Sequence, residues 1–107
     1  MKELTNAQFY NSRRWLRLRE SVLRRDGYLC QIAKRYGKIE EAENVHHIFP
    51  RLEFPEYQFE AWNLISLSHK AHTAMHQAAS GELSPAGIDL LRRTARKFGK
   101  PVPEKYS

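Results

Sequence analysis

The chain has 107 residues, of which 28% are charged and 41% hydrophobic, and it contains five glycines and five prolines. This length fits a single domain, and the composition excludes collagen-like, low-complexity and disordered chains. The one cysteine, Cys30, cannot pair within the chain, which excludes a disulfide framework and favours a reducing compartment such as the cytosol. No run of about 18 apolar residues is present, and the first four residues lack the apolar stretch of a secretory signal.

The formal net charge of +6 favours a polyanionic partner, and this charge is unevenly distributed along the chain. Residues 1–35 carry nine basic and three acidic side chains, residues 36–84 three and seven, and residues 85–107 six and two. Solvated helix faces can produce the same pattern. Neither basic flank has the broad apolar face of a membrane-surface helix, so we expect no membrane partner and prefer nucleic acid.

Two helical segments are expected at the N-terminal end. The stretch that begins at Thr5 has capping-box spacing, which predicts a helical turn. A longer helix is predicted over about 12–26, because Trp15, Leu18 and Val22 are spaced i, i+3 and i+7. Arginines occupy the rest of its circumference, and an Asp-Gly pair supplies the end.

The middle of the chain is expected to contain two paired strands and a helix. Residues 28–32 are compatible with a short additional strand. The β-branched and aromatic run at 45–49, closed by a proline, predicts one strand, and the apolar run at 62–67 predicts its partner. A helix is then expected over 68–80, before a glycine.

The last helix is predicted over about 84–98. Ser84 is a suitable N-cap, Pro85 fits the first helical position, and an apolar stripe starts at Ile88. Gly99 and a nearby proline supply the end of this helix.

All five histidines fall between positions 46 and 76. His72 and His76 are spaced i, i+4, so a helix would place both on one face, where two imidazoles can bind one metal ion. Neighbours on a strand point to opposite faces, so one of His46 and His47 could join them while the other stays free. Either pair alone is more often structural. Together they indicate three nitrogen ligands with open positions and a fourth histidine able to act as a general base near neutral pH.

These motifs resemble the HNH (His-Asn-His) endonuclease family over roughly Ser12 to Ala79. The matching segments are Trp15–Arg19, Leu23–Gln31, Val45–Pro50, Asn63–Leu67 and Ala71–His72, with His76. The resemblance implies a ββα-metal fold, whose active site lies on two strands and a helix. We therefore expect one α+β domain over 1–107, with this core at about 43–80 between the Arg-rich helix at 12–26 and the helix at 84–98.

The resemblance also implies roles for five residues. His46, His72 and His76 would bind one divalent cation, Mg, Mn, Zn, Ni or Co, and His47 would be the general base that activates water. Asn63 would brace the loop and the imidazole of His47. The reaction implied is hydrolysis of phosphodiester bonds in DNA, by nicking or double-strand cleavage, leaving 5′-phosphate and 3′-hydroxyl ends.

Many members of this family also carry a structural zinc bound by four cysteines. In this chain Cys30 stands at one such position, but the other three are Ala33, Ser68 and Ala71. One thiolate cannot hold that zinc. We therefore expect apolar packing in its place and no second metal.

Arginines on the flanks are predicted to contact DNA phosphates without selecting a base sequence. The candidates are Arg13, Arg14, Arg17, Arg24, Arg25, Arg51, Arg92, Arg93 and Arg96. Small stand-alone members of the family are often encoded by phages, sometimes beside packaging machinery. We therefore expect the cytosol of a host cell, a monomer or weak dimer, and a packaging protein as a candidate partner.

Two other functions stay open from the sequence. A catalytically degenerate member of the family would bind DNA without cleaving it, and a structural His-metal domain would mediate protein contacts. The endonuclease is favoured because all of the histidines and the asparagine that the family motif requires are present.

Overall fold

The structure is a computed structural model that describes residues 4–107. The first three residues, part of the stretch considered for a secretory signal, lie outside the described range. The elements in chain order are α1 (Asn6–Tyr10), α2 (Arg13–Arg25), α3 (Gln31–Arg35), β1 (Asn44–His47), the 3-10 turns η1 (Pro55–Tyr57) and η2 (Ala61–Asn63), β2 (Leu64–Leu67), α4 (His69–Ala74), α5 (Pro85–Phe98) and η3 (Glu104–Tyr106).

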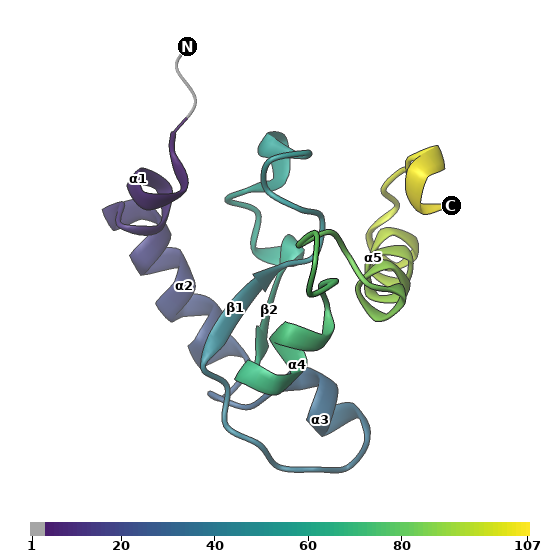
Figure 1. Ribbon diagram of the computed structural model, residues 1–107. Coiled ribbons are helices and arrows are strands. Elements are labelled where there is room, and N and C mark those ends of the chain that lie inside the picture. Colours follow the sequence, from purple (N-terminus) through teal and green to yellow (C-terminus); the bar gives the residue numbers. More distant parts are fainter. Residues whose placement is uncertain (1–3) are drawn as a thin grey trace.

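A two-stranded antiparallel sheet of β1 and β2 lies at the centre of the molecule. In Figure 1, α2 runs beside the sheet on one side, α4 lies across its other side, and α5 lies beyond α4. The succession of β1, β2 and α4 confirms the α+β class and the ββα arrangement predicted from the sequence. Within the described range, no helix is both long enough and apolar enough to cross a membrane.

α1 begins at the predicted capping box, and α2 begins after Ser12, close to where the second helix was predicted to start. The hydroxyl of Thr5 accepts a hydrogen bond from the backbone N–H of Gln8, and the Gln8 side chain accepts one from the backbone N–H of Thr5. Ser12 caps α2 in the same way, accepting from the N–H of Trp15. These bonds satisfy helix N–H groups that have no partner within the helix. α2 buries Trp15 and Val22, as its periodicity predicts.

The short strand considered at residues 28–32 is not formed. Leu29 makes only an isolated bridge to Glu41, and α3 follows directly. The end of α2 prevents a strand from forming here, because both Gly27 and Tyr28 adopt positive φ angles and turn the chain away from an extended path. A β-compatible composition was therefore overridden by the way in which the preceding helix ends.

The helix expected over 68–80 ends at Ala74, so α4 is half as long as predicted. His76 lies beyond the helix and forms an isolated antiparallel bridge with Leu83. The chain reverses at Gly81, whose φ of 75° suits a residue without a side chain. The i, i+4 spacing could not distinguish a continuing helix from a turn that keeps the two histidines close.

The register of the sheet places His46 opposite Ile65 and His47 opposite Leu64. Successive side chains on a strand point to opposite faces. His46 therefore faces α4, where its ring lies near that of His72, and His47 faces α2.

Apolar side chains fill the space on both faces of this small sheet. The first cluster, between the sheet and the N-terminal helices, contains Phe9, Trp15, Val22, Leu23, Val45 and Leu64. The second, toward α3 and α5, contains Cys30, Ala33, Ile48, Phe49, Leu67, Met75, Leu83, Leu90, Leu91, Ala95 and Tyr106. An isolated two-stranded hairpin is marginally stable in water, so both clusters are needed to hold the sheet.

α5 confirms the predicted C-terminal helix at both ends. Its N-cap Ser84 accepts a hydrogen bond from the N–H of Gly87, and Gly99 ends it with a φ of 66°. Gly87 also allows a close approach to the chain after α4, because a Cβ there would lie 2.3 Å from the carbonyl oxygen of Met75. The helix is thereby fixed against the segment that carries His76.

Asp26, at the end of α2, joins that helix to the sheet. Its carboxylate accepts hydrogen bonds from the backbone N–H of Ser66 at 3.0 Å and from the guanidinium of Arg25 at 2.9 and 3.0 Å. Burial raises the pKa of Asp26, but these hydrogen bonds outweigh the burial and leave the pKa below its ordinary value. The ionised carboxylate thus satisfies an N–H group on the outer edge of β2.

Replacing this carboxylate by an amide is expected to weaken the fold. Asp26→Asn should lower the free energy of unfolding by about 1–2 kcal/mol at pH 7, because hydrogen bonds to a charged group are lost. The pKa of Asp26 is lower in the folded than in the unfolded chain, so the stabilisation exists above about pH 4 and disappears as the pH falls below that value.

Urea unfolding of both proteins at pH 7, 4 and 3 measures this difference. Asp89→Asn, at an exposed carboxylate paired with Arg93 on α5, is the matched control and should change stability by less than about 0.5 kcal/mol. A constant difference for Asp26→Asn over the whole pH range would contradict the prediction.

Candidate metal centre and active site

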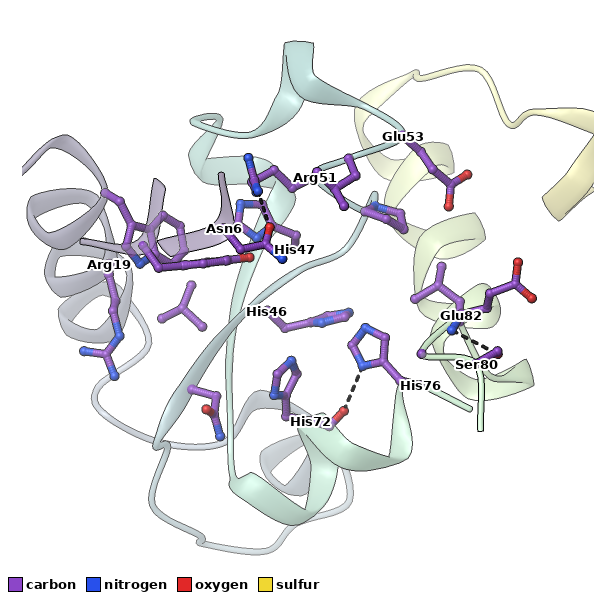
Figure 2. Close-up of a pocket in the computed structure, with 18 of the residues that line it drawn as sticks. Asn6, Arg19, His46, His47, Arg51, Glu53, His72, His76, Ser80 and Glu82 are labelled. Carbon is purple, nitrogen blue, oxygen red and sulfur yellow. Dashed lines mark hydrogen bonds between the residues drawn. The ribbon is translucent and has the colours of Figure 1, made fainter. Parts of the chain in front are cut away.

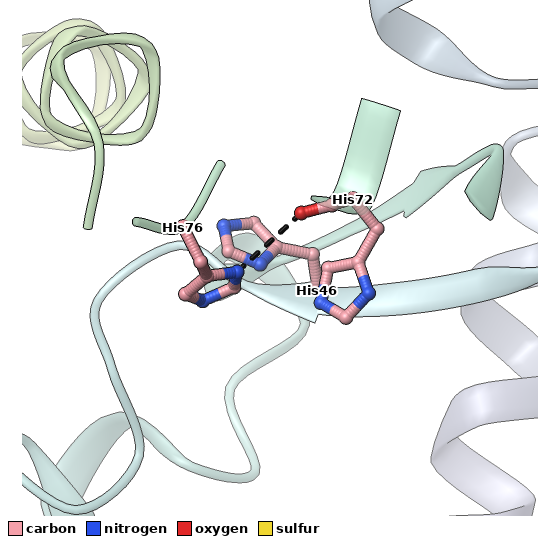
Figure 3. Close-up of side chains that lie close together, drawn as sticks. All are labelled: His46, His72 and His76. Carbon is pink, nitrogen blue, oxygen red and sulfur yellow. Dashed lines mark hydrogen bonds between the residues drawn. The ribbon is translucent and has the colours of Figure 1, made fainter. Parts of the chain in front are cut away.

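Three histidines that are distant in sequence meet on one face of the sheet. Their ligand nitrogens all lie within 4.8 Å of one another, so His46, His72 and His76 could hold a metal ion. His46 comes from β1, His72 from α4 and His76 from the turn that follows α4 (Figure 3). The structure thus brings together the predicted ligand set, although His76 lies outside the helix expected to carry it.

The chemistry of these rings fits a divalent cation. Nε2 of His46 is buried and has no hydrogen-bond partner in the described part of the protein. Burial, and then the proximity of His72 and His76, lower the pKa of His46 well below its ordinary value, so the ring is neutral at pH 7. A buried polar atom without a partner costs free energy, and a metal ion is a partner that a neutral ring nitrogen can bind.

The ring of His76 is oriented by the backbone of α4. Its Nδ1 lies 3.4 Å from the carbonyl oxygen of His72, drawn as a dashed line in Figure 3. A carbonyl can only accept, so this contact requires the proton on Nδ1 and leaves Nε2 of His76 available as a ligand. Histidines that bind metals are commonly oriented by such a contact at the second ring nitrogen.

His47 points to the opposite face of β1 and lies in a different environment. Its Nε2 is 3.1 Å from the main-chain carbonyl oxygen of Gln58, and its ring stacks on Trp15 at a centroid distance of 5.0 Å. The carbonyl requires the proton on Nε2, so Nδ1 carries the free lone pair. Burial lowers the pKa of His47 to about 4; the Gln58 carbonyl opposes this shift, and the charge of Arg51 adds to it. The imidazole is therefore neutral at pH 7.

Asn63 is completely buried and acts on the loop after β1. Its side-chain oxygen accepts from the N–H of Phe49 at 2.7 Å, and its amide donates to the carbonyls of Phe49 at 3.1 Å and Tyr57 at 3.3 Å. The part of the prediction that had Asn63 brace the imidazole of His47 is corrected. That ring bonds instead to the carbonyl of Gln58, the residue after Tyr57, so Asn63 influences His47 only through the loop.

The metal-ligand set and His47 open onto one pocket of about 620 Å³, shown in Figure 2. It lies along β1 and is closed on one side by α1 and α2 and on the other by the turn around Gly81. Its lining residues are Asn6, Tyr10, Trp15, Leu16, Arg19, Asn44, Val45, His46, His47, Pro50, Arg51, Leu52, Glu53, His72, His76, Ser80, Gly81, Glu82 and Leu83. A neutral imidazole and three candidate metal ligands therefore share one cavity.

Comparison with known proteins gives one solved relative of clear similarity. No protein-family model and no curated protein matches this chain. The crystal structure of the HNH endonuclease of the deep-sea thermophilic bacteriophage GVE2, determined with manganese ion, is 42% identical. The alignment covers 61% of this chain and 71% of the phage chain, with a TM-score of 0.60. The chain belongs to the HNH endonuclease family.

This HNH protein departs from the four-cysteine zinc found in many members of the family. Cys30 and Ala33 are buried in the larger core cluster, and Ala71 packs against that cluster. Ser68, at the fourth position, caps α4 by accepting from the N–H of Ala71 at 3.2 Å. The four positions that carry zinc-binding cysteines in those family members are thus occupied here by residues that make apolar contacts and a helix cap.

The five arginines predicted on α2 lie in different environments. Arg13 and Arg17 are exposed and make no ion pair or side-chain hydrogen bond within residues 4–107, and the Arg14 guanidinium lies 3.8 Å from the centre of the Phe59 ring. Arg24 is 3.8 Å from a glutamate of the same helix. Arg25 donates to two main-chain carbonyls and to its neighbouring aspartate. The guanidinium of Arg25 is therefore engaged in holding the fold.

The other predicted arginines also divide into free and engaged groups. Arg92 donates to the main-chain carbonyl of Tyr106 at 2.6 Å, and Arg93 pairs with an aspartate one turn earlier. Arg96 is exposed, and no ion pair of its guanidinium occurs in the described range. Arg51 is buried at the wall of the pocket, close to His47.

Three residues of the site, two of which line the pocket, were missed by sequence reasoning. Arg19 belongs to the same arginine run as its neighbours, and that run could have indicated it. Gln58 acts through its main-chain carbonyl, which has no signature in the sequence. Asn6 reaches the pocket only because α1 folds over it, and its spacing from the histidines carries no signal.

Because the buried side chain of Asn63 fixes the loop through three hydrogen bonds, its removal should affect stability as well as activity. Asn63→Ala is expected to lower the free energy of unfolding by about 3 kcal/mol, since the N–H of Phe49 and two carbonyls lose their partner. Urea unfolding measures this loss. Asn11→Ala, at an exposed position after α1, serves as a control. A folded and fully stable Asn63→Ala protein would contradict the structural role.

Proposed function

We propose that this HNH protein is a metal-dependent endonuclease that hydrolyses phosphodiester bonds in DNA. The observation that carries the proposal is the buried Nε2 of His46, which lies where three histidines meet and has no hydrogen-bond partner among the described residues. The neutral His47 in the same pocket supplies the second group that hydrolysis requires. The 42% identical phage relative, which is an endonuclease determined with manganese, supports the same activity.

The proposed metal ligands are His46, His72 and His76. A divalent cation bound there would offset the negative charge that develops on the phosphate and leaving oxygen during hydrolysis. Three imidazoles favour Zn, Ni, Co or Mn over Mg in affinity, and each of these ions is a candidate. Three protein ligands leave coordination positions open, as in catalytic rather than structural sites.

His47 is proposed as the general base, and Asn63 as the residue that keeps its loop in place. The lone pair on Nδ1 accepts a proton from the attacking water, while the hydrogen bond from Nε2 to the Gln58 carbonyl keeps the ring fixed. This hydrogen bond strengthens as the ring becomes positively charged. A substrate phosphate in the pocket adds negative charge, which raises the pKa of His47 and improves it as a base.

The two roles are separable by mutation. His47→Ala should lower cleavage of plasmid DNA in the presence of Mn²⁺ by at least 100-fold and preserve the rise in melting temperature that Mn²⁺ causes. His72→Ala should lose both cleavage and the metal-dependent rise, because one of three ligands is removed. Agarose gels and thermal unfolding with and without Mn²⁺ measure these effects.

His69→Ala is the matched histidine control, because His69 is exposed on α4 and does not belong to the ligand set. It should retain cleavage and the response to Mn²⁺. If His47→Ala cleaves as well as the parent protein, the proposed base is wrong. If the parent binds DNA but does not cleave it with Mg²⁺, Mn²⁺, Zn²⁺, Ni²⁺ or Co²⁺, the protein is a DNA-binding member of the family instead.

Phosphate contacts are proposed for the arginines of both flanks and for Arg51. The exposed guanidinium groups of Arg13, Arg17 and Arg96 are the most available, whereas Arg25 and Arg92 are engaged within the fold. Such contacts supply affinity without base selection. The proposal also includes a phage or mobile-element origin, a location in the cytosol of the host cell, a packaging protein as partner, and a monomer or weak dimer of one domain. The phage origin of the relative supports the first of these.

The arginine contacts make a prediction about salt dependence. The double variant Arg13→Ala/Arg17→Ala should bind duplex DNA more weakly at 50 mM salt, and the slope of log affinity against log salt should decrease in magnitude by about 2. Fluorescence anisotropy with a labelled duplex between 50 and 200 mM KCl measures this slope. An unchanged slope would place the DNA away from this face of α2.

A further inference from the structure

Arg51 is a buried cation that has no counter-ion among residues 4–107. Only 8% of the residue is exposed, and no carboxylate of residues 4–107 lies within 4.0 Å of its guanidinium. Its polar partners are two side-chain amide oxygens, those of Asn6 and, at 3.5 Å, Gln58. The guanidinium also lies over the ring of Phe9, 4.4 Å from its centre, and 5.6 Å from that of Tyr10.

The nearest carboxylate along the chain does not cancel this charge. Glu53 accepts a hydrogen bond from the hydroxyl of Tyr106 at 2.5 Å and lies 3.5 Å from the ammonium of Lys105. Figure 2 shows its carboxylate directed away from Asn6 and Arg51. A buried charge that is oriented but not neutralised is costly to the fold, and a ligand anion would compensate for it.

The partners of Arg51 are held by rigid parts of the structure. Asn6 is the first residue of α1, which is fixed by its capping box and by the fully buried Phe9. Gln58 bonds to Arg51 with its side chain and to His47 with its main chain. The guanidinium and the proposed base are thus positioned by one loop residue and line the same pocket.

We propose that Asn6 is a positioning residue for an anion site at Arg51. The uncharged amide oxygen of Asn6 orients the guanidinium without cancelling its charge. Arg51 can therefore bind a phosphate group of the nucleic-acid substrate beside His47. An aspartate at position 6 would have nearly the same shape but would form an ion pair with Arg51. α1, which precedes the segment that resembles the family, is then part of the substrate site.

The proposal rests on the proposed nuclease function. It is tested by comparing the DNA affinities of the parent protein, Asn6→Ala and Asn6→Asp. Asn6→Ala keeps the charge of Arg51 but loses its orientation, whereas Asn6→Asp keeps an oxygen at that place but neutralises the charge. We expect the affinity for DNA to fall about threefold for Asn6→Ala and about tenfold or more for Asn6→Asp. The slope of log affinity against log salt should decrease in magnitude by about 1 for Asn6→Asp and should not change for Asn6→Ala.

A purely structural role for Asn6 predicts the opposite order, because Asn6→Asp would strengthen the contact to Arg51 and Asn6→Ala would remove it. Thermal unfolding should show Asn6→Asp at least as stable as the parent, so that weaker binding is not due to misfolding. Asn11→Asp makes the same charge change at the end of α1, where no contact to Arg51 exists in the described structure. It should change the affinity by less than about twofold.

Binding is measured by anisotropy of a fluorescein-labelled 12-base-pair duplex with phosphorothioate linkages, on the full chain in the presence of Mg²⁺. Cleavage of the unmodified duplex is measured in parallel, where KM should rise more than kcat falls in both variants. If the parent protein binds DNA but does not cleave it, the nuclease function is wrong. The order of the three DNA affinities then still tests the anion site by itself. Asn6→Asp binding as tightly as the parent, or no binding by the parent, overturns the proposal.

Discussion

The alternation of side chains along β1 is the constraint on which the site depends. Adjacent histidines on a strand must face opposite sides, and the register with β2 fixes which side each one takes. His46 therefore meets His72 and His76, while His47 is enclosed by α1 and α2. A slip of one residue would exchange the two faces and remove both environments at once. The register matters more here than the length of the strand, which is four residues.

Neutral imidazoles are maintained at both faces, but by different means. His46 lies beside two further histidines, and no carboxylate of residues 4–107 stabilises its charged form. His47 is desolvated by aromatic rings and lies near a permanent cation, Arg51. The first environment leaves a ring nitrogen without a partner, which suits a metal ligand. The second provides a carbonyl that fixes the proton on Nε2, which suits a base.

Sequence patterns predicted the parts of the fold that local interactions determine. The apolar spacing of α2 and α5, together with the cap at Ser84, was sufficient for both helices. The same reasoning failed at residues 28–32 and at the end of α4, where successive left-handed residues and a reversal at Gly81 override local propensity. The histidine cluster was predictable because spacing and strand alternation are local. The main-chain contact of Gln58 and the placement of Asn6 depend on long-range packing, which no local pattern records.

The loop after β1 shows why the flanking helices belong to the site. A two-stranded hairpin and a six-residue helix provide little rigidity by themselves. The loop is held from α1 through Arg51, from the core through Asn63, and from the C-terminal segment through the bond between Glu53 and Tyr106. Each attachment comes from a different part of the chain, and together they fix the carbonyl that orients His47. The fixed position of His47 on so small a sheet therefore derives from the packing of α1 and the C-terminal segment around its loop.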